Sequence, residues 1–172
     1  RGLRFPVDPS SGAFCTLGGM AATNAAGART LRYGATRVWV TAAECVFSDG
    51  SRVVVRRGES RGASAPALDR FHSAVAPRVR QTSAALLKRA GVRKESSGYA
   101  LAEFVRSDDL LEVILGSEGT LCLITAVELG LDAIPGATAS VLAAFPSLAS
   151  AVDGARASRE GDASASELLD RT

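Results

Sequence analysis

Residues 6–34 read PVDPSSGAFCTLGGMAATNAAGARTLRYG, and this stretch decides the expected fold and function of the chain. The prolines at its start favour an extended path with turns, because proline fixes its own backbone and restricts the residue before it. Gly18 and Gly19 then precede a run of small residues. Such a backbone can approach a flat or phosphorylated ligand closely, and free N–H groups at a helix start favour negative charge. The simpler alternative is a tight turn that leads into an alanine-rich, packed helix.

A second glycine-bearing segment, Gly116-Ser117-Glu118-Gly119-Thr120-Leu121, follows far downstream. Together the two segments resemble the FAD-binding domain of the vanillyl-alcohol oxidase superfamily, in the branch of D-lactate dehydrogenases and glycolate oxidase subunits. The motifs of that family read roughly P-D-P-S-S-x-x-x-C/A-T-I-G-G-M-x-A-T-N-A-x-G and G-S-E-G-T-L-G-I-I-T. This chain departs from them with Leu17 in place of isoleucine and Cys122 in place of glycine. A third stretch, residues 94–101, is similar to K-N-S-S-G-Y-N-L, with Glu95 in place of asparagine.

The resemblance implies an α+β fold with two parts. Residues 1–133 would form the second half of a PCMH-type FAD-binding domain, a mainly antiparallel sheet flanked by helices. Residues 134–172 would begin the α+β substrate (cap) domain of an FAD-linked oxidase, because Ala165–Asp170 is similar to the family's S-A-x-E-L-L-D segment. The chain lacks an initiator Met and the second domain is only begun, so we expect the chain to be a fragment.

The resemblance also implies non-covalent binding of FAD, with close backbone donors for its diphosphate. The implied cofactor-binding residues are Pro9, Ser10, Ser11, Cys15, Thr16, Gly18, Gly19, Thr23, Asn24, Ala25, Ala26, Tyr33, Gly34, Glu118, Gly119, Thr120, Leu121, Leu123 and Ile124. For Tyr33 the alternative is simple packing, and for Glu118 a cap or surface carboxylate. Three arginines near the first segment, Arg29, Arg32 and Arg37, form a loose basic cluster that could attract phosphate, although we expect it to be solvated, as such clusters more often are.

By resemblance, the full-length protein oxidises a 2-hydroxy acid of the D-lactate or glycolate type, with hydride transfer to flavin N5. The catalytic base would lie outside this chain, so the fragment alone would be inactive. His72, the only histidine, matches no family motif and has no Ser-His-Asp partners, and no clustered metal ligands occur in the sequence. One alternative function is a non-catalytic flavin-domain subunit or remnant with a structural role in an assembly, and a second alternative is an α+β domain that binds nothing.

Composition describes one globular core, with 172 residues, 47% hydrophobic and 22% charged, and a net charge of +2. No basic block favours nucleic acid, and no apolar run reaches the length of a transmembrane helix. The three widely spaced cysteines favour a reducing, cytoplasmic setting, with the full-length protein peripheral to a membrane as a further option. Expected partners are FAD, a small 2-hydroxy acid, and a second copy or a partner subunit.

Hydrophobic periodicity and turn residues predict the order of the secondary structure. Strands are predicted at 41–47, 52–55, 120–131, 138–145 and 164–169, and helices at 16–25, 67–75, 81–90 and 146–160. Ser48-Asp49-Gly50-Ser51 predicts the hairpin turn between the first two strands. Asp108 and Asp109 predict the start of one more helix that ends at Leu115, because aspartate accepts from free N–H groups there.

Overall fold

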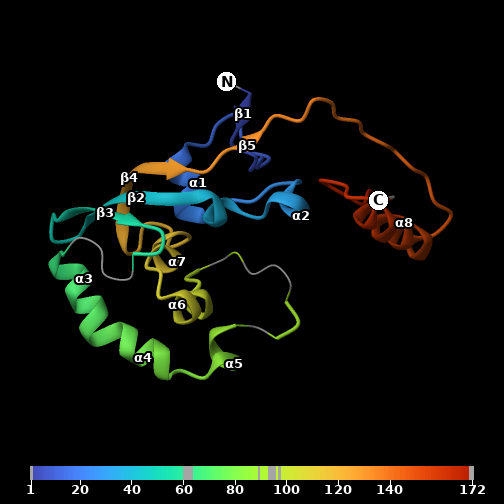
Figure 1. The fold of residues 1–172 in the computed structure, drawn as a ribbon. Coiled ribbons are helices and arrows are strands. Elements are labelled where there is room, and N and C mark those ends of the chain that lie inside the picture. Colours follow the sequence, from blue (N-terminus) through green and yellow to red (C-terminus); the bar gives the residue numbers. More distant parts are fainter. Residues whose placement is uncertain (1, 60–63, 89, 93–95, 97, 171–172) are drawn as a thin grey trace.

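A computed structural model describes residues 2–59, 64–88, 90–92, 96 and 98–170 of the chain. The fold is α+β, as predicted, with antiparallel sheets and flanking helices (Figure 1). The main sheet has the order β3-β2-β4, with β2 at Val40–Phe47, β3 at Arg52–Arg56 and β4 at Cys122–Leu129. A second, two-stranded sheet pairs β1, Leu3–Arg4, with β5, Asp132–Ala133.

The hairpin between β2 and β3 forms where the sequence predicts it. The carboxylate of Asp49 accepts a hydrogen bond from the N–H of Ser51 over 2.9 Å, and Gly50 adopts a positive φ of 81°. Along β3, Val53 and Val55 are buried while Arg52 and Arg56 are exposed. This alternation turns one face of the sheet toward the core and the other toward water.

Short helices lie around the main sheet, and those that contain Ala21, Leu111 and Ile114 pack against its buried face (Figure 1). Their bounds are α1 Leu17–Thr23, α2 Thr30–Tyr33, η1 Thr36–Trp39, α6 Leu101–Ser107 and α7 Leu111–Ile114. Leu111, Ile114 and Leu115 pack with Val40 and Cys45 in the largest group of buried side chains. Asp109 caps α7, as predicted, since its carboxylate accepts from the N–H of Leu111 over 2.9 Å. Asp108 instead ends α6 in the left-handed conformation, and α6 itself is not among the predicted helices.

The predicted helix at 67–75 is part of a longer helical run. It comprises α3 Pro66–Arg70, a π-helical turn at Phe71–Val75 and α4 Ala76–Gln81, followed by α5 Ala84–Leu87. The N–H of Ala76 donates to the carbonyl of Phe71, five residues back. Pro77 accounts for this wider turn, because proline has no N–H and its ring clashes with the carbonyl four residues earlier in a regular helix.

Two of the predicted strands are wrong. Residues 138–145 and 164–169 are irregular, whereas the helix predicted between them is present as α8, Leu148–Glu160. Their apolar side chains suit a strand, but neither segment pairs with another strand in the described part of the chain. A strand needs a neighbour to satisfy its backbone groups, so composition alone does not make one. The 94–101 match includes residues 94, 95 and 97, and the predicted helix at 81–90 includes residue 89; these four residues lie outside the described part of the chain.

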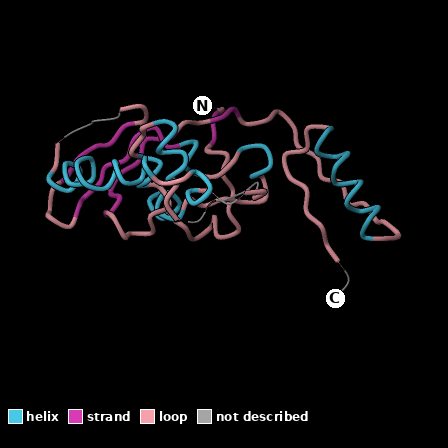
Figure 2. The backbone as a smooth tube through the Cα atoms, turned by 90° about the horizontal axis from the view of Figure 1, so that it is seen from below, coloured by secondary structure: helices cyan, strands magenta, loops and turns pink. Residues whose placement is uncertain are grey.

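The C-terminal segment lies apart from the sheets in both views (Figures 1 and 2). A capping box of Ser147 and Ser150 begins α8, and the ring of Phe145 packs against Gly154, where a Cβ would lie 2.4 Å from the ring. One ion pair, Arg32 to Asp162 at 2.9 Å, connects the segment with α2. None of the helices described is long and apolar enough to cross a membrane.

Candidate functional site

The two glycine-bearing segments lie side by side. The N–H of Gly116 donates to the carbonyl of Ala21 over 3.1 Å, and the N–H of Glu118 donates to the carbonyl of Ala22 over 2.9 Å. A Cβ at Gly18 would lie 3.4 Å from the carbonyl oxygen of Ile124, so α1 also rests on β4. The fold therefore brings the two predicted halves of the site to one place.

The start of α1 leaves backbone donors open. Thr16 caps the helix, because its hydroxyl accepts from the N–H of Gly19 over 3.0 Å and its carbonyl accepts from the N–H of Met20. Within the described residues, no acceptor reaches the N–H groups of Leu17 and Gly18. Gly19 is exposed and Gly18 half-buried, so these donors lie next to a bare stretch of backbone.

The second segment forms a tight, exposed turn at the same place. Glu118 and Gly119 both adopt positive φ, 52° and 78°, and the space beside Gly119 is open, with no atom within 4 Å of a Cβ built there. The hydroxyl of Thr120 donates to the carbonyl of Ser117 and lies 2.7 Å from the hydroxyl of Tyr99. Tyr99 therefore lies beside the site, although it is not among the predicted cofactor-binding residues. The only sequence signal for it is its place in the third match, residues 94–101.

The loop before α1 is compact. The N–H of Gly12 donates to the carbonyl of Pro9, and those of Phe14 and Cys15 donate to the carbonyl of Ser11. Gly27 packs directly against the backbone of this loop, because a Cβ at position 27 would lie 1.7 Å from the carbonyl oxygen of Asp8. The hydroxyl-bearing residues Ser10 and Ser11 are exposed, and so is the ring of Phe14, at 92%.

The residues at the end of α1 contact the interior of the domain. Asn24 is 4% exposed and adopts the left-handed conformation, and its side-chain oxygen accepts from the N–H of Arg37 over 2.9 Å. The carbonyl of Ala25 accepts from both the N–H and the hydroxyl of Thr36. These contacts give Asn24 and Ala25 structural roles, and their contact with FAD stays a prediction. Thr23 is exposed and bonds back to the carbonyl of Gly19, and Ala26 is half-buried.

Arg37 is buried, so the expectation that this basic cluster is solvated is wrong for it. Its guanidinium donates to the carbonyl of Leu115 over 2.5 Å and lies 3.5 Å from the carboxylate of Glu112. Arg57 bonds to Glu112 as well, and to Asp109 at 3.1 Å. Burial lowers the pKa of Arg37, while the carboxylate of Glu112 opposes that change. No sequence signal distinguishes this arginine from its exposed neighbours.

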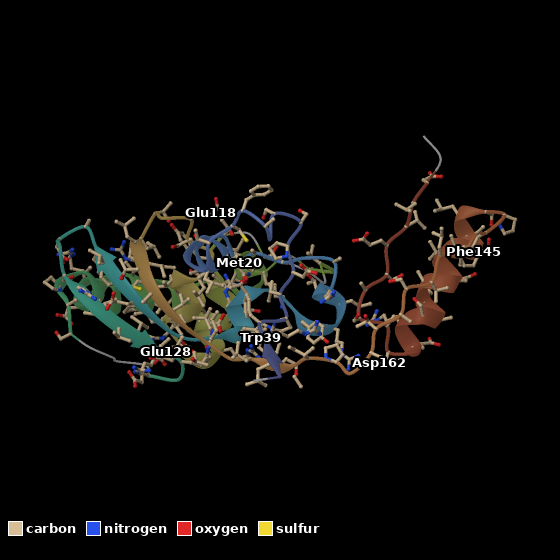
Figure 3. The ribbon with its side chains drawn as sticks, turned by 90° about the horizontal axis from the view of Figure 1, so that it is seen from above. Met20, Trp39, Glu118, Glu128, Phe145 and Asp162 are labelled. Carbon is tan, nitrogen blue, oxygen red and sulfur yellow. The ribbon has the colours of Figure 1, made fainter. Side chains whose placement is uncertain are left out.

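Tyr33 and Gly34 lie elsewhere. The hydroxyl of Tyr33 accepts from Arg4 over 2.8 Å, and its carbonyl accepts from the indole N–H of Trp39. Figure 3 shows Trp39, which Tyr33 contacts, in the half of the domain away from Glu118. The structure therefore brings α1 and the 116–124 segment together, and the loop before α1 is continuous with that helix. Leu121 and Leu123 are exposed and Ile124 is half-buried, and Tyr33 has its contacts with Arg4 and Trp39 instead.

Residues 1–56 match the family model described as an FAD binding domain. The chain carries part of an FAD-binding domain. It is 36% identical over 152 residues to a probable mitochondrial D-lactate dehydrogenase of Danio rerio, and 32% identical over 147 residues to a D-2-hydroxyglutarate dehydrogenase of Xanthomonas citri. These alignments cover 88% and 86% of this chain and 22% of each relative. The chain therefore spans about a fifth of the length of the relatives that it matches.

Among solved structures, the chain is similar to an alkyldihydroxyacetonephosphate synthase, with a TM-score of 0.49 and 22% identity. The match covers 91% of this chain and 21% of that one.

The residues of this FAD-binding domain suit the nucleotide end of FAD. The N–H groups of Leu17 and Gly18 are donors without an acceptor among the described residues, which is what a diphosphate requires. The open backbone at Gly119 and the exposed Gly19 leave room for a flat group to approach. Binding here would rest on backbone groups, since the nearby arginine, Arg37, already has partners inside the fold.

Proposed function

We propose that this chain forms part of the FAD site of a flavin-dependent oxidoreductase that acts on 2-hydroxy acids of the D-lactate or glycolate type. The observation that carries the proposal is the contact between α1 and the 116–124 segment, which joins the two motifs of the family. The two relatives are named for D-lactate and D-2-hydroxyglutarate, and both compounds carry a hydroxyl on the carbon beside a carboxylate. That shared group supports the substrate class.

The residues of this chain would bind and orient the cofactor. The N–H groups of Leu17 and Gly18 would donate to the diphosphate, and Gly119 would let the nucleotide lie against bare backbone. Thr16 holds the start of α1 in place through its cap, and Tyr99 fixes the hydroxyl of Thr120 beside the same surface. Binding is non-covalent in this proposal.

FAD would supply the redox chemistry by accepting a hydride from the carbon that carries the hydroxyl. A base that takes the hydroxyl proton is not assigned to this chain. His72 lies on the π-helical turn with its ring 5.6 Å from that of Phe71, in an edge-to-face contact, which suits a packing role.

We further propose that the FAD-binding part ends at residue 133 and that residues 134–172 begin the substrate domain. The separation of α8 from the sheets supports this division (Figure 2). Within this arrangement, the chain alone is expected to retain FAD weakly or not at all.

The test compares FAD retention by the protein encoded by the whole reading frame that contains this chain, before and after the change Gly19→Arg. We expect wild type to keep the visible flavin spectrum after gel filtration, and the variant to lose it, because the new side chain fills the space beside the open donors. Gly136→Arg is the matched control, since Gly136 is exposed and lies far along the chain in the irregular segment before α8.

A colourless wild-type protein would overturn the proposal, and retention by the Gly19→Arg variant would remove this segment from the site. Anaerobic bleaching of the bound flavin by D-lactate, glycolate or D-2-hydroxyglutarate then identifies the substrate. A protein that holds FAD and is bleached by none of them would favour the alternative, a non-catalytic flavin subunit.

A further inference from the structure

Arg37 occupies a position between the two motifs of the site. It belongs to η1, Thr36–Trp39, which follows the first motif in the chain. Arg37 is only 9% exposed. Its side chain extends to the residues that immediately precede the second motif. A buried arginine is costly unless its donors find partners. The Nε of Arg37 makes no hydrogen bond within the described residues, so the contacts of its other atoms indicate its role.

On one side, Arg37 contacts the end of the first motif. Its backbone N–H donates to the side-chain oxygen of Asn24 over 2.9 Å. Asn24 in turn ends α1, because its own N–H bonds to the carbonyls of Ala21 and Met20. Ala21 is also the residue whose carbonyl accepts from Gly116. The position of Asn24 therefore fixes where α1 stops relative to Arg37.

On the other side, Arg37 contacts the start of the second motif. Its guanidinium donates to the carbonyl of Leu115, a fully buried residue, over 2.5 Å. Gly116 follows directly, with a φ of 88°, and a Cβ there would lie 2.8 Å from the guanidinium and 3.2 Å from the Cβ of Asn24. Arg37, Asn24 and Gly116 are thus packed against one another with no room for a further atom.

The guanidinium is held from a third direction by α7. The carboxylate of Glu112 lies 3.5 Å from its Nε, and Arg57 shares that carboxylate while donating to the carbonyl of Arg37 over 2.7 Å. Arg57 makes its remaining bonds to Asp109 and to the carbonyl of Val40. It supports the same cluster and, among the described residues, contacts neither motif, which makes it a natural comparison for Arg37.

We propose that Arg37 is a positioning residue that holds the Gly18-Gly19 end of α1 and the Glu118-Gly119 turn in the relative placement that FAD requires. This rests on the proposed function of the site. Arg37 acts through Asn24 and Leu115 and does not contact the ligand. Loss of its guanidinium leaves the carbonyl of Leu115 buried without a donor and removes the side-chain link between the motifs. The backbone bonds from Gly116 to Ala21 and from Glu118 to Ala22 then hold the two motifs with less support.

The experiment measures the dissociation constant of FAD by titration of its fluorescence, with the whole-reading-frame protein stripped of flavin. We expect Arg37→Met to weaken binding about tenfold or more, because small misplacements of binding groups carry large costs. Arg37→Lys keeps the charge and places N–H donors on a single nitrogen but lacks the planar fork, so an intermediate constant is expected. The melting temperature of each apoprotein is measured alongside.

Arg57→Met is the control for stability, since it removes the other arginine of the cluster. We expect it to lower the melting temperature as Arg37→Met does, yet to leave the FAD constant within about threefold of wild type. If Arg37→Met does not fold, Arg37→Lys carries the comparison. An unchanged constant in a folded Arg37 variant, or an equal loss with Arg57→Met, would overturn the proposal while wild type still binds FAD. A wild-type protein without FAD affinity would overturn the proposed function itself.

Discussion

The backbone N–H of Glu118 donates a hydrogen bond to the carbonyl oxygen of Ala22 over 2.9 Å. These residues are far apart in the sequence, and each belongs to one of the two glycine-bearing segments. Backbone bonds of this kind do not depend on the side chains at either end, so the contact survives many substitutions. Its maintenance depends on the glycines that let the chain turn there.

Gly116→Ala should destabilise the fold more than Gly119→Ala. Both glycines adopt positive φ, 88° and 78°, so each alanine carries a similar backbone strain of about 1 kcal/mol. At Gly116 the new Cβ also meets the guanidinium of Arg37 at 2.8 Å, whereas at Gly119 it meets open space. We expect a further loss of about 1–3 kcal/mol for Gly116→Ala, measured by urea unfolding. Equal losses in the two variants would show that this packing is not tight in solution.

The sequence specified the hairpin, α1 and α8 well, because each depends on neighbours in the chain. Asp49 and Gly50 determine one turn locally, and Thr16 and Ser147 cap their helices through residues three positions on. It predicted strands at 138–145 and 164–169 that are absent, since a strand depends on a partner that local pattern does not reveal. Within the site, the meeting of the two motifs followed from resemblance, but the burial of Arg37 and the contact of Tyr99 with Thr120 depend on tertiary packing.

The stability of the exposed sheet face should decline in acid. Hydrogen bonds from Arg52 and Thr125 lower the pKa of Glu44 from its ordinary value of 4.5, and Arg56 does the same for Glu128. A carboxylate whose pKa is lower in the folded than in the unfolded state contributes stability above the unfolded value, and this is lost as pH falls through the folded one.

Glu44→Gln should therefore reduce the dependence of the urea midpoint on pH between about pH 6 and about pH 3. The effect is small because these pairs are exposed. Glu160→Gln on α8, with the same change of charge away from the sheet, is the control. A pH profile that is identical for wild type and Glu44→Gln would contradict the expected role of this pair.

The three thiols should react at different rates. Cys45 and Cys122 are buried on β2 and β4, and the interaction of the two thiols, together with burial, raises the pKa of Cys45, while the same interaction lowers the pKa of Cys122. Cys15 is only half-buried, in the loop before α1. Since reagents need an accessible thiolate, we expect one fast reaction in the native chain and two more after denaturation. The count comes from titration with a chromogenic disulfide, and Cys15→Ser should remove the fast phase. Rapid reaction of all three thiols in the folded chain would show that the sheet opens readily.

Limited proteolysis should cut first between Ile134 and Ser147. Val141 and Leu142 are 89% and 90% exposed in an irregular segment, and thermolysin prefers to cleave beside such apolar residues. The product that ends near this segment should keep the melting temperature of the intact chain, because the core lies in the sheets and the helices that cover them. Val141→Asp with Leu142→Asp should slow this cut without changing the melting temperature. Early cleavage within β2 or α7, or a loss of stability after the first cut, would mean that the C-terminal segment is part of the same folding unit and that residue 133 is not a domain boundary.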